Sequence, residues 1–263
     1  PNTSATAASS GSDLNGQAVK NACVVLRQRI AKVAASMLEL DAKEARHLIF
    51  ENGLVYHSSS PGKTLTFEEV TNQAWIRQVS LSATGYYRTP DIRYDYATGS
   101  GKPFHYFAYG TAVSEIELNG LTGGHQVTRV DILHDVGSSL VPSIDIGQIE
   151  GGFVQGMGWL TNEDVLWTDQ GRLISHCPSV YKIPAIGDVP QHFKVDLLDK
   201  APQKEVIHGS KAVGEPPFML AISIVTALRH AILSFGRPQT LDLASPATPE
   251  AVLRAISEAK NQS

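Results

Sequence analysis

Residues 211–218 read Lys-Ala-Val-Gly-Glu-Pro-Pro-Phe and place one acid, Glu215, between a glycine and two prolines. Proline has a fixed φ and no N–H, so the pair stiffens the backbone beside the carboxylate. We expect Pro217 to open the apolar helix predicted over residues 218–235, because proline is tolerated at the first helical position. Glu215 is therefore expected on a rigid corner at the positive end of a helix dipole, where an acid either stabilises the helix or does chemistry.

The bulk composition is that of an ordinary globular protein. The chain has 263 residues, of which 42% are hydrophobic and 18% charged, and its net charge is −4. That length suffices for one large domain or two small ones. The charge gives no reason to expect binding to nucleic acid or to a membrane surface. No unbroken apolar run is long enough to span a bilayer.

Cysteine and histidine usage argues against a metal held by protein side chains. Cys23 and Cys177 are isolated, and the nine histidines are scattered without ligand-like pairing. This pattern has neither zinc nor iron–sulfur spacing. Two isolated cysteines also indicate a reducing compartment.

Hydrophobic periodicity predicts five helices and several short strands. Asp13 is expected to cap the first helix, and Thr66 to Glu69 forms a capping box for the second. The helices are predicted over residues 13–37, 66–77, 144–160, 218–235 and 249–259. The strands are predicted over residues 54–57, 79–84, 105–118, 126–135, 165–167, 173–175 and 193–198.

These elements indicate an α+β fold in which mixed or antiparallel sheets pack with helices. Residues 105–118 and 126–135 are expected to form a hairpin, and residues 165–167 and 173–175 a second one. The interspersed strands and helices lack the regular alternation of a doubly wound fold. Residues 86–103 read as a loop, and residues 41–70 as a variable connection.

The first twelve residues are almost all Ser, Thr, Ala and Gly. Small residues let backbone N–H groups approach an anion, and hydroxyls add donors, so a phosphate or a pterin is a possible ligand. Composition alone favours a flexible tail. The chain begins at Pro1 with no initiator Met and no signal-peptide pattern, and we therefore expect it to be a piece of a longer polypeptide.

The helix predicted over residues 144–160 carries glycines on one face. Its apolar ridge is expected to comprise Ile146, Ile149, Phe153, Met157 and Leu160. The opposite face holds Gln148, Gly151, Gly152, Gln155 and Gly158. Glycine costs about 1 kcal/mol against alanine in a helix, so several on one face need a reason. Close approach of a cofactor or of another backbone supplies one, and plain helix–helix packing is equally consistent. Either glutamine can donate an amide hydrogen bond to a bound group or face water.

Glu215 is the main candidate for chemistry. A general base needs burial or a charged neighbour to tune it. The alternative is a carboxylate that stabilises a helix N-terminus by about 0.3–1 kcal/mol. The stiff Gly-Glu-Pro-Pro frame favours the chemical role, because a surface cap needs no such rigidity. Lys182 and Lys211 are expected to be solvated.

Seven stretches, in order and covering most of the chain except residues 41–70 and about the last 25, resemble a known family. They are residues 1–9 (Pro-Asn-Thr-Ser-Ala-Thr-Ala-Ala-Ser), 85–90 (Gly-Tyr-Tyr-Arg-Thr-Pro), 104–107 (Phe-His-Tyr-Phe), 135–140 (Asp-Val-Gly-Ser-Ser-Leu), 145–151 (Asp-Ile-Gly-Gln-Ile-Glu-Gly), 181–185 (Tyr-Lys-Ile-Pro-Ala) and 210–217 (Ser-Lys-Ala-Val-Gly-Glu-Pro-Pro). Through them the sequence resembles the C-terminal part of the molybdenum-cofactor domain of the xanthine dehydrogenase/oxidase family.

The resemblance implies the second half of the molybdopterin-binding region of a molybdenum hydroxylase, with residues 1–263 forming that region. It implies that Gln148 lies beside the cofactor and that Glu215 is the general base. The residues that match the molybdopterin-binding loop are Thr6, Ala7, Ala8, Ser9, Ser10 and Gly11. In this family the pterin dithiolene holds the molybdenum, in agreement with the missing ligand spacing.

The implied activity is oxidative hydroxylation of purines, from hypoxanthine to xanthine to urate, with oxygen from water. The presence of Pro216-Pro217 and of residues 87–90 favours purines over the aldehydes of the related aldehyde oxidases. The resemblance also implies 2Fe-2S clusters and FAD on other domains or chains, substrate-orienting residues upstream of Pro1, a dimeric full assembly and a cytoplasmic location. An aldehyde oxidase-like enzyme and a non-catalytic assembly module remain alternatives.

Overall fold

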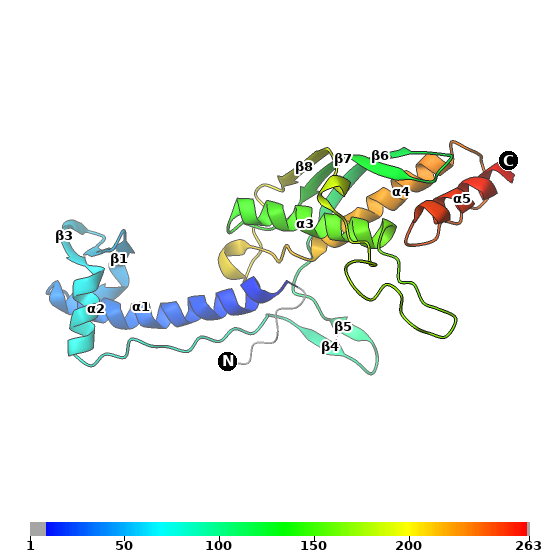
Figure 1. Ribbon diagram of the computed structural model, residues 1–263. Coiled ribbons are helices and arrows are strands. Elements are labelled where there is room, and N and C mark those ends of the chain that lie inside the picture. The colour runs from blue at the N-terminus through cyan, green and yellow to red at the C-terminus, as the bar shows by residue number, and fades with distance from the viewer. Residues whose placement is uncertain (1–8, 262–263) are drawn as a thin grey trace. The chain divides into compact units, whose positions relative to one another are not determined.

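The computed structural model describes residues 9–261. They divide into two compact units, one of residues 11–102 and one of residues 9–10 with 103–261. Among these residues no helix combines the length and the apolar character needed to cross a membrane. Figure 1 shows the elements of both units.

The first unit contains a long helix, a three-stranded sheet and a separate short hairpin. Its elements are α1 (Gln17–Met37), β1 (Leu48–Glu51), β2 (Leu54–His57), β3 (Ser60–Thr66), α2 (Phe67–Ile76), β4 (Arg93–Asp95) and β5 (Ser100–Lys102). A π-helical turn (Ser12–Gly16) precedes α1, and a 3-10 helix (Ala42–His47) follows it. The sheet is antiparallel in the order β1-β2-β3, and β4 pairs with β5.

The two helices predicted for this unit are confirmed. The capping box of α2 is present, because the Glu69 N–H donates to Thr66 Oγ1 at 3.1 Å and the Thr66 N–H donates to Glu69 Oε2 at 2.7 Å. The predicted cap at Asp13 is wrong, since Asp13 lies inside the π-helical turn that leads into α1. Only the C-terminal part of α1 is buried, against residues of β1, β2 and α2.

Of the three sheet strands, only β2 was predicted. Asn52 and Gly53, with φ of 49° and 75°, form the tight turn between β1 and β2. An Asn-Gly pair is the usual signal for such a turn, so the sequence carried this information. β3 is mostly polar and exposed, and its residues do not alternate between apolar and polar. Periodicity therefore did not predict this strand.

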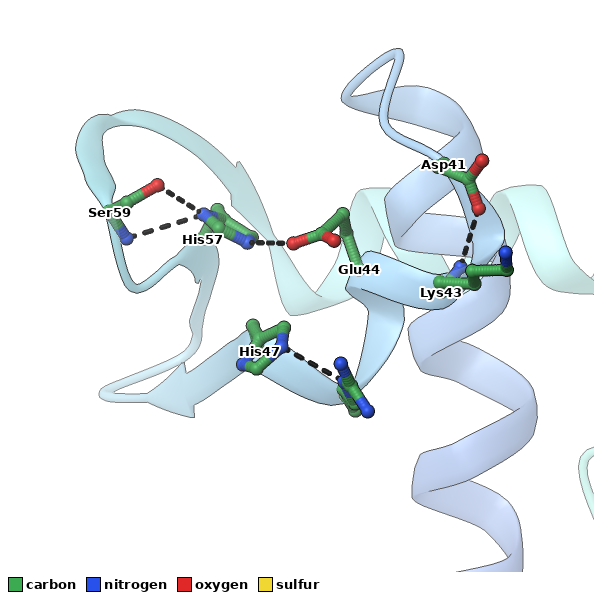
Figure 2. A network of polar contacts seen from close by, with 7 residues as sticks. Asp41, Lys43, Glu44, His47, His57 and Ser59 are labelled. Carbon is green, nitrogen blue, oxygen red and sulfur yellow. Dashed lines mark hydrogen bonds and ion pairs between the residues drawn. The ribbon is translucent and has the colours of Figure 1, made fainter.

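A polar network ties the 3-10 helix to the β2–β3 turn (Figure 2). His57 Nε2 lies 3.1 Å from Glu44 Oε2, and His57 Nδ1 lies 2.7 Å from Ser59 Oγ. The Ser59 N–H donates to the same Nδ1 at 3.2 Å. Because Ser59 is two residues from His57, this contact stabilises a local turn.

The strand predicted over residues 79–84 is wrong. This segment is irregular, and the Arg29 side chain of α1 binds the carbonyl oxygens of Ser80 and Ser82 at 3.2 and 2.8 Å. A side chain thus takes the place of a neighbouring strand. The predicted loop of residues 86–103 contains the β4–β5 hairpin.

The second unit is a mixed sheet with helices packed on one face. Its elements are β6 (Gly110–Leu118), β7 (His125–His134), α3 (Pro142–Thr161), β8 (His192–Leu197), α4 (Ile222–Ile232) and α5 (Pro249–Asn261). β6 and β7 are antiparallel, and β8 pairs with β7 in parallel. Val130, Ile132 and His134 of β7 are buried, whereas the intervening residues are more exposed, so one face of the sheet is covered. The predicted α+β class with mixed sheets is confirmed.

The core of this unit joins β7, α3, α4 and α5. Ile149 and Phe153 of α3 and Ile224 and Leu228 of α4 are fully buried in it. The predicted ridge of α3 therefore faces the core through its central residues. The predicted hairpin of residues 165–175 is reduced to a single bridge between Trp167 and Leu173.

The apolar helix predicted over residues 218–235 is divided in two. A 3-10 helix (Pro216–Ala221) comes first, and α4 begins at Ile222. Pro216, not Pro217, is the first helical residue. A proline there costs nothing, because its missing N–H has no intrahelical acceptor.

Candidate active site

The loop that carries Glu215 runs beside the chain that follows β7. We call residues 209–215 the Glu215 loop. Ser210 of this loop forms an antiparallel β-bridge with Gly137. The Lys211 N–H donates to the Val136 carbonyl at 2.8 Å, and the Ser138 N–H donates to the Gly209 carbonyl at 2.8 Å. These contacts hold the Glu215 loop against the chain that follows β7.

Glu215 lies at the junction of this loop and the 3-10 helix. Its carbonyl accepts the Phe218 N–H at 3.0 Å, but its side chain makes no capping hydrogen bond. Glu215 is exposed, whereas Pro217 is buried. The Glu215 side chain therefore makes no capping hydrogen bond, although the residue occupies the N-cap position, and the prolines hold the backbone while the carboxylate stays accessible.

Ser9 and Gln148 converge on Gly214, the residue before the acid. A Cβ added at Gly214 would lie 2.7 Å from Ser9 Oγ and 3.0 Å from Gln148 Oε1. Ser9 has a left-handed φ of 52°, and Gln148 is on the exposed side of α3. Three segments far apart in the sequence meet here.

The glycine face of α3 brings the Glu215 loop close to that helix. A Cβ at Gly152 would lie 3.0 Å from the Gly214 carbonyl oxygen, and one at Gly156 would overlap the Phe218 carbonyl. A Cβ at Gly158 would instead meet the Pro184 ring and the Glu163 carboxylate. A close backbone thus explains Gly152 and Gly156, whereas close side chains explain Gly158. Gly151 is different, because a Cβ there would meet nothing within 4 Å.

The residues around Gly214 fit a pterin. The edge of a pterin presents ring N–H groups, ring nitrogens and a carbonyl. The hydroxyl of Ser9 and the amide of Gln148 can each donate and accept hydrogen bonds to such an edge.

The other residues expected in the cofactor loop have different positions. Thr6, Ala7 and Ala8 lie outside the described residues. Ser10 is half-buried in the second unit, and Gly11 directly precedes the π-helical turn of the first. Of the expected site residues, Ser9, Ser10, Gln148 and Glu215 thus lie in the described part of the second unit, where Gly214 joins them.

Lys211 is not solvated, contrary to the prediction. Its Nζ lies 2.5 Å from Asp135 Oδ2, and the two side chains are 8% and 4% exposed. The same Nζ donates to the Phe107 carbonyl at 2.9 Å. Lys182, in contrast, makes an exposed pair with Asp188.

Sequence reasoning from periodicity missed Asp135 and Tyr106 as partners of the Glu215 loop. The Tyr106 hydroxyl accepts the Ala212 N–H at 2.7 Å. Both residues lie in stretches that carry the family resemblance, residues 135–140 and 104–107. The available signal was therefore the resemblance and not the local pattern.

Comparisons with known proteins identify the family. The family model described as "Molybdopterin cofactor-binding domain" matches residues 1–190. The xanthine dehydrogenase/oxidase of Gallus gallus is 44% identical over 259 residues, which are 97% of this chain and 17% of that protein. The xanthine dehydrogenase of Oryza sativa subsp. japonica is 40% identical over 266 residues, covering 97% of this chain and 18% of that protein.

The solved structures agree. Quinoline 2-oxidoreductase from Pseudomonas putida 86 superposes with a TM-score of 0.81 at 26% identity, covering 96% of this chain and 31% of that one. The chain thus spans less than a fifth of the relatives it matches in sequence. It belongs to the molybdopterin cofactor-binding domain family and is a molybdenum-cofactor-binding region of the xanthine dehydrogenase type.

Proposed function

We propose that this chain is the C-terminal part of the cofactor region of a molybdenum hydroxylase that converts hypoxanthine to xanthine and xanthine to urate. The observation that carries the proposal is the convergence of Ser9 and Gln148 on Gly214, directly before the exposed Glu215. In this proposal a cofactor cradle and a rigidly held base are thereby close in space. We propose residues 1–263 as one functional region that is active only with the rest of the enzyme.

Each residue has a defined task in this proposal. The loop of Thr6, Ala7, Ala8, Ser9, Ser10 and Gly11 binds the molybdopterin with its N–H and hydroxyl groups. The Gln148 amide hydrogen-bonds the same cofactor, and Gly214 leaves room for it. Molybdenum, held by the pterin dithiolene, supplies the redox step.

Glu215 takes a proton from the water-derived oxygen nucleophile as that oxygen attacks an electron-poor carbon of the purine. A positioned general base contributes about 10²–10⁴-fold to a rate. Pro216 and Pro217 fix the backbone on one side of the acid, so the carboxylate has little freedom to leave the reacting oxygen. The exposure of Glu215 lets a substrate reach it.

The choice of purines rests on two observations. Residues 87–90 (Tyr-Arg-Thr-Pro) and the Pro216-Pro217 pair match the purine-oxidising branch in our reading of the family. The relatives at 40% identity and above are named xanthine dehydrogenases or xanthine dehydrogenase/oxidases. We also propose 2Fe-2S clusters and FAD on other domains or chains, a dimeric assembly and a cytoplasmic location.

The test uses the complete enzyme that contains this chain. Its molybdenum and pterin are quantified, and turnover of hypoxanthine, xanthine and an aromatic aldehyde is compared in H₂¹⁸O. We expect both cofactor components, urate as the final product and ¹⁸O in that urate. Preferred turnover of the aldehyde would assign an aldehyde oxidase-like enzyme. Absence of molybdenum and pterin would instead indicate a non-catalytic assembly module.

A further inference from the structure

Lys211 lies four residues before the proposed base and forms a buried ion pair with Asp135. We propose that this pair sets the position of the Glu215 loop, so that Lys211 is a positioning residue for the Glu215 carboxylate. The inference rests on the proposed function, and it adds a role for two residues that do not themselves touch the substrate.

The pair joins three segments of the second unit. Lys211 Nζ binds Asp135 Oδ2 at 2.5 Å and the Phe107 carbonyl at 2.9 Å. It also lies 5.8 and 5.4 Å from the ring centroids of Tyr106 and Tyr109. The other oxygen of Asp135 accepts the Gly137 N–H at 2.9 Å. The end of β7, the aromatic segment 104–109 and the Glu215 loop thus share one charged centre.

The backbone on both sides of the acid is anchored. Before it, the Lys211 N–H binds the Val136 carbonyl and the Ala212 N–H binds the Tyr106 hydroxyl. After it, Pro217 is buried, and residues 214–218 pack on the glycine face of α3. The short segment 213–216 therefore spans two fixed points, and Lys211 holds the first of them.

Stability alone is a poor reason for such a pair. Two buried charges lose their hydration, and well-packed apolar residues often stabilise a fold as well or better. A hydrogen-bonded pair fixes distances and directions, which apolar packing does less strictly. The precise position of the Glu215 carboxylate matters for catalysis, because a misplacement of a reacting group by about 1 Å lowers the rate on the order of 10²-fold.

The test is the double variant Lys211→Met/Asp135→Asn in the complete enzyme. Methionine fills the space of the lysine stem, and asparagine keeps an oxygen for the Gly137 N–H, so neither charge is left unpaired. We expect kcat for xanthine to fall by roughly 10–100-fold, following the misplacement penalty, with unchanged KM and molybdenum content. Hydrogen exchange is expected to rise in residues 209–215 and not in α5.

The matched control is Lys194→Met/Asp196→Asn. That pair is separated by 2.7 Å on β8 and its side chains are 67% and 57% exposed. The same chemical change there is expected to leave kcat and exchange unaltered.

Three outcomes decide the matter. A double variant with wild-type kcat and wild-type exchange overturns the inference. So does one that loses molybdenum or exchanges faster throughout the second unit, because the pair is then only structural. Full turnover by Glu215→Gln would overturn the proposed function itself, whatever the ion pair does.

Discussion

At the residue scale, a side chain at Gly214 would meet groups from two other segments of the proposed site. The Ser9 hydroxyl and the Gln148 amide approach it from two other segments, and α3 passes close to its carbonyl. Glu215 was proposed from the sequence because its frame of glycine and prolines is unusual. Lys211 was misjudged, because lysine is rarely buried and its partner Asp135 lies 76 residues away.

Gly214→Ala is expected to lower the molybdenum and pterin content of the complete enzyme. The added methyl would lie 2.7 Å from Ser9 Oγ and 3.0 Å from Gln148 Oε1, so both side chains must move. Overpacking of this kind costs about 1–3 kcal/mol, equivalent to roughly a 5–150-fold loss of cofactor affinity. Metal analysis after dialysis measures it.

Gly151→Ala is the control on α3, since its methyl would meet nothing within 4 Å. It is expected to keep the cofactor and to raise stability by up to about 1 kcal/mol. Equal cofactor contents in the two variants would show that Gly214 does not border the cofactor.

At the scale of elements, hydrophobic periodicity and turn residues predicted helices and a hairpin that form between residues close in sequence. α3 was predicted over residues 144–160 and extends over Pro142–Thr161, because its apolar period matches the core. The β6–β7 hairpin followed from its glycine-rich turn. The parallel pairing of β7 with β8 joins residues about 60 apart in sequence, and no local pattern encodes it. Residues 79–84 were wrongly predicted as a strand. Their carbonyl oxygens at Ser80 and Ser82 accept hydrogen bonds from the Arg29 side chain and not from another strand.

Thr66→Ala is expected to destabilise α2 by about 0.5–2 kcal/mol, because it removes the hydroxyl that accepts the Glu69 N–H. Amide hydrogen exchange of residues 67–76 measures the change. Thr71→Ala is the control within the same helix, where the hydroxyl binds only the Glu68 carbonyl. Similar exchange in both variants would mean that the capping box contributes nothing to α2.

At the scale of the whole chain, the described residues of the proposed site other than Gly11 lie within the second unit. Its core of β7, α3, α4 and α5 supports the Glu215 loop, and the apolar residues of that core were largely evident from periodicity. The arrangement of Ser9, Gln148 and Gly214 was not evident, since only the family resemblance linked these distant segments. The composition of the chain likewise did not predict its division into two units.

The second unit is expected to lose stability as the pH falls below about 6.5. Burial lowers the pKa of His134 in β7 and of His125 at its start. The unfolded chain therefore binds more protons between the folded pKa and the ordinary value of 6.5, and the free energy of unfolding decreases through that window. The slope is at most about 1.4 kcal/mol per pH unit for each histidine.

Urea unfolding at several pH values between 5 and 8 measures this dependence. His134→Gln is expected to flatten it, whereas His230→Gln, at an exposed position of α4, leaves it unchanged. A pH dependence that survives in His134→Gln/His125→Gln would assign the acid sensitivity to other groups.

The central claim is that Glu215 is the base beside a molybdenum cofactor. It is tested most directly by single-turnover reduction of the complete Glu215→Gln enzyme with xanthine, at matched molybdenum content. Glutamine keeps the size of the side chain but cannot take the proton. The account predicts a rate lower by about 10²–10⁴-fold with undiminished molybdenum. A rate within a few-fold of the wild-type enzyme would contradict it.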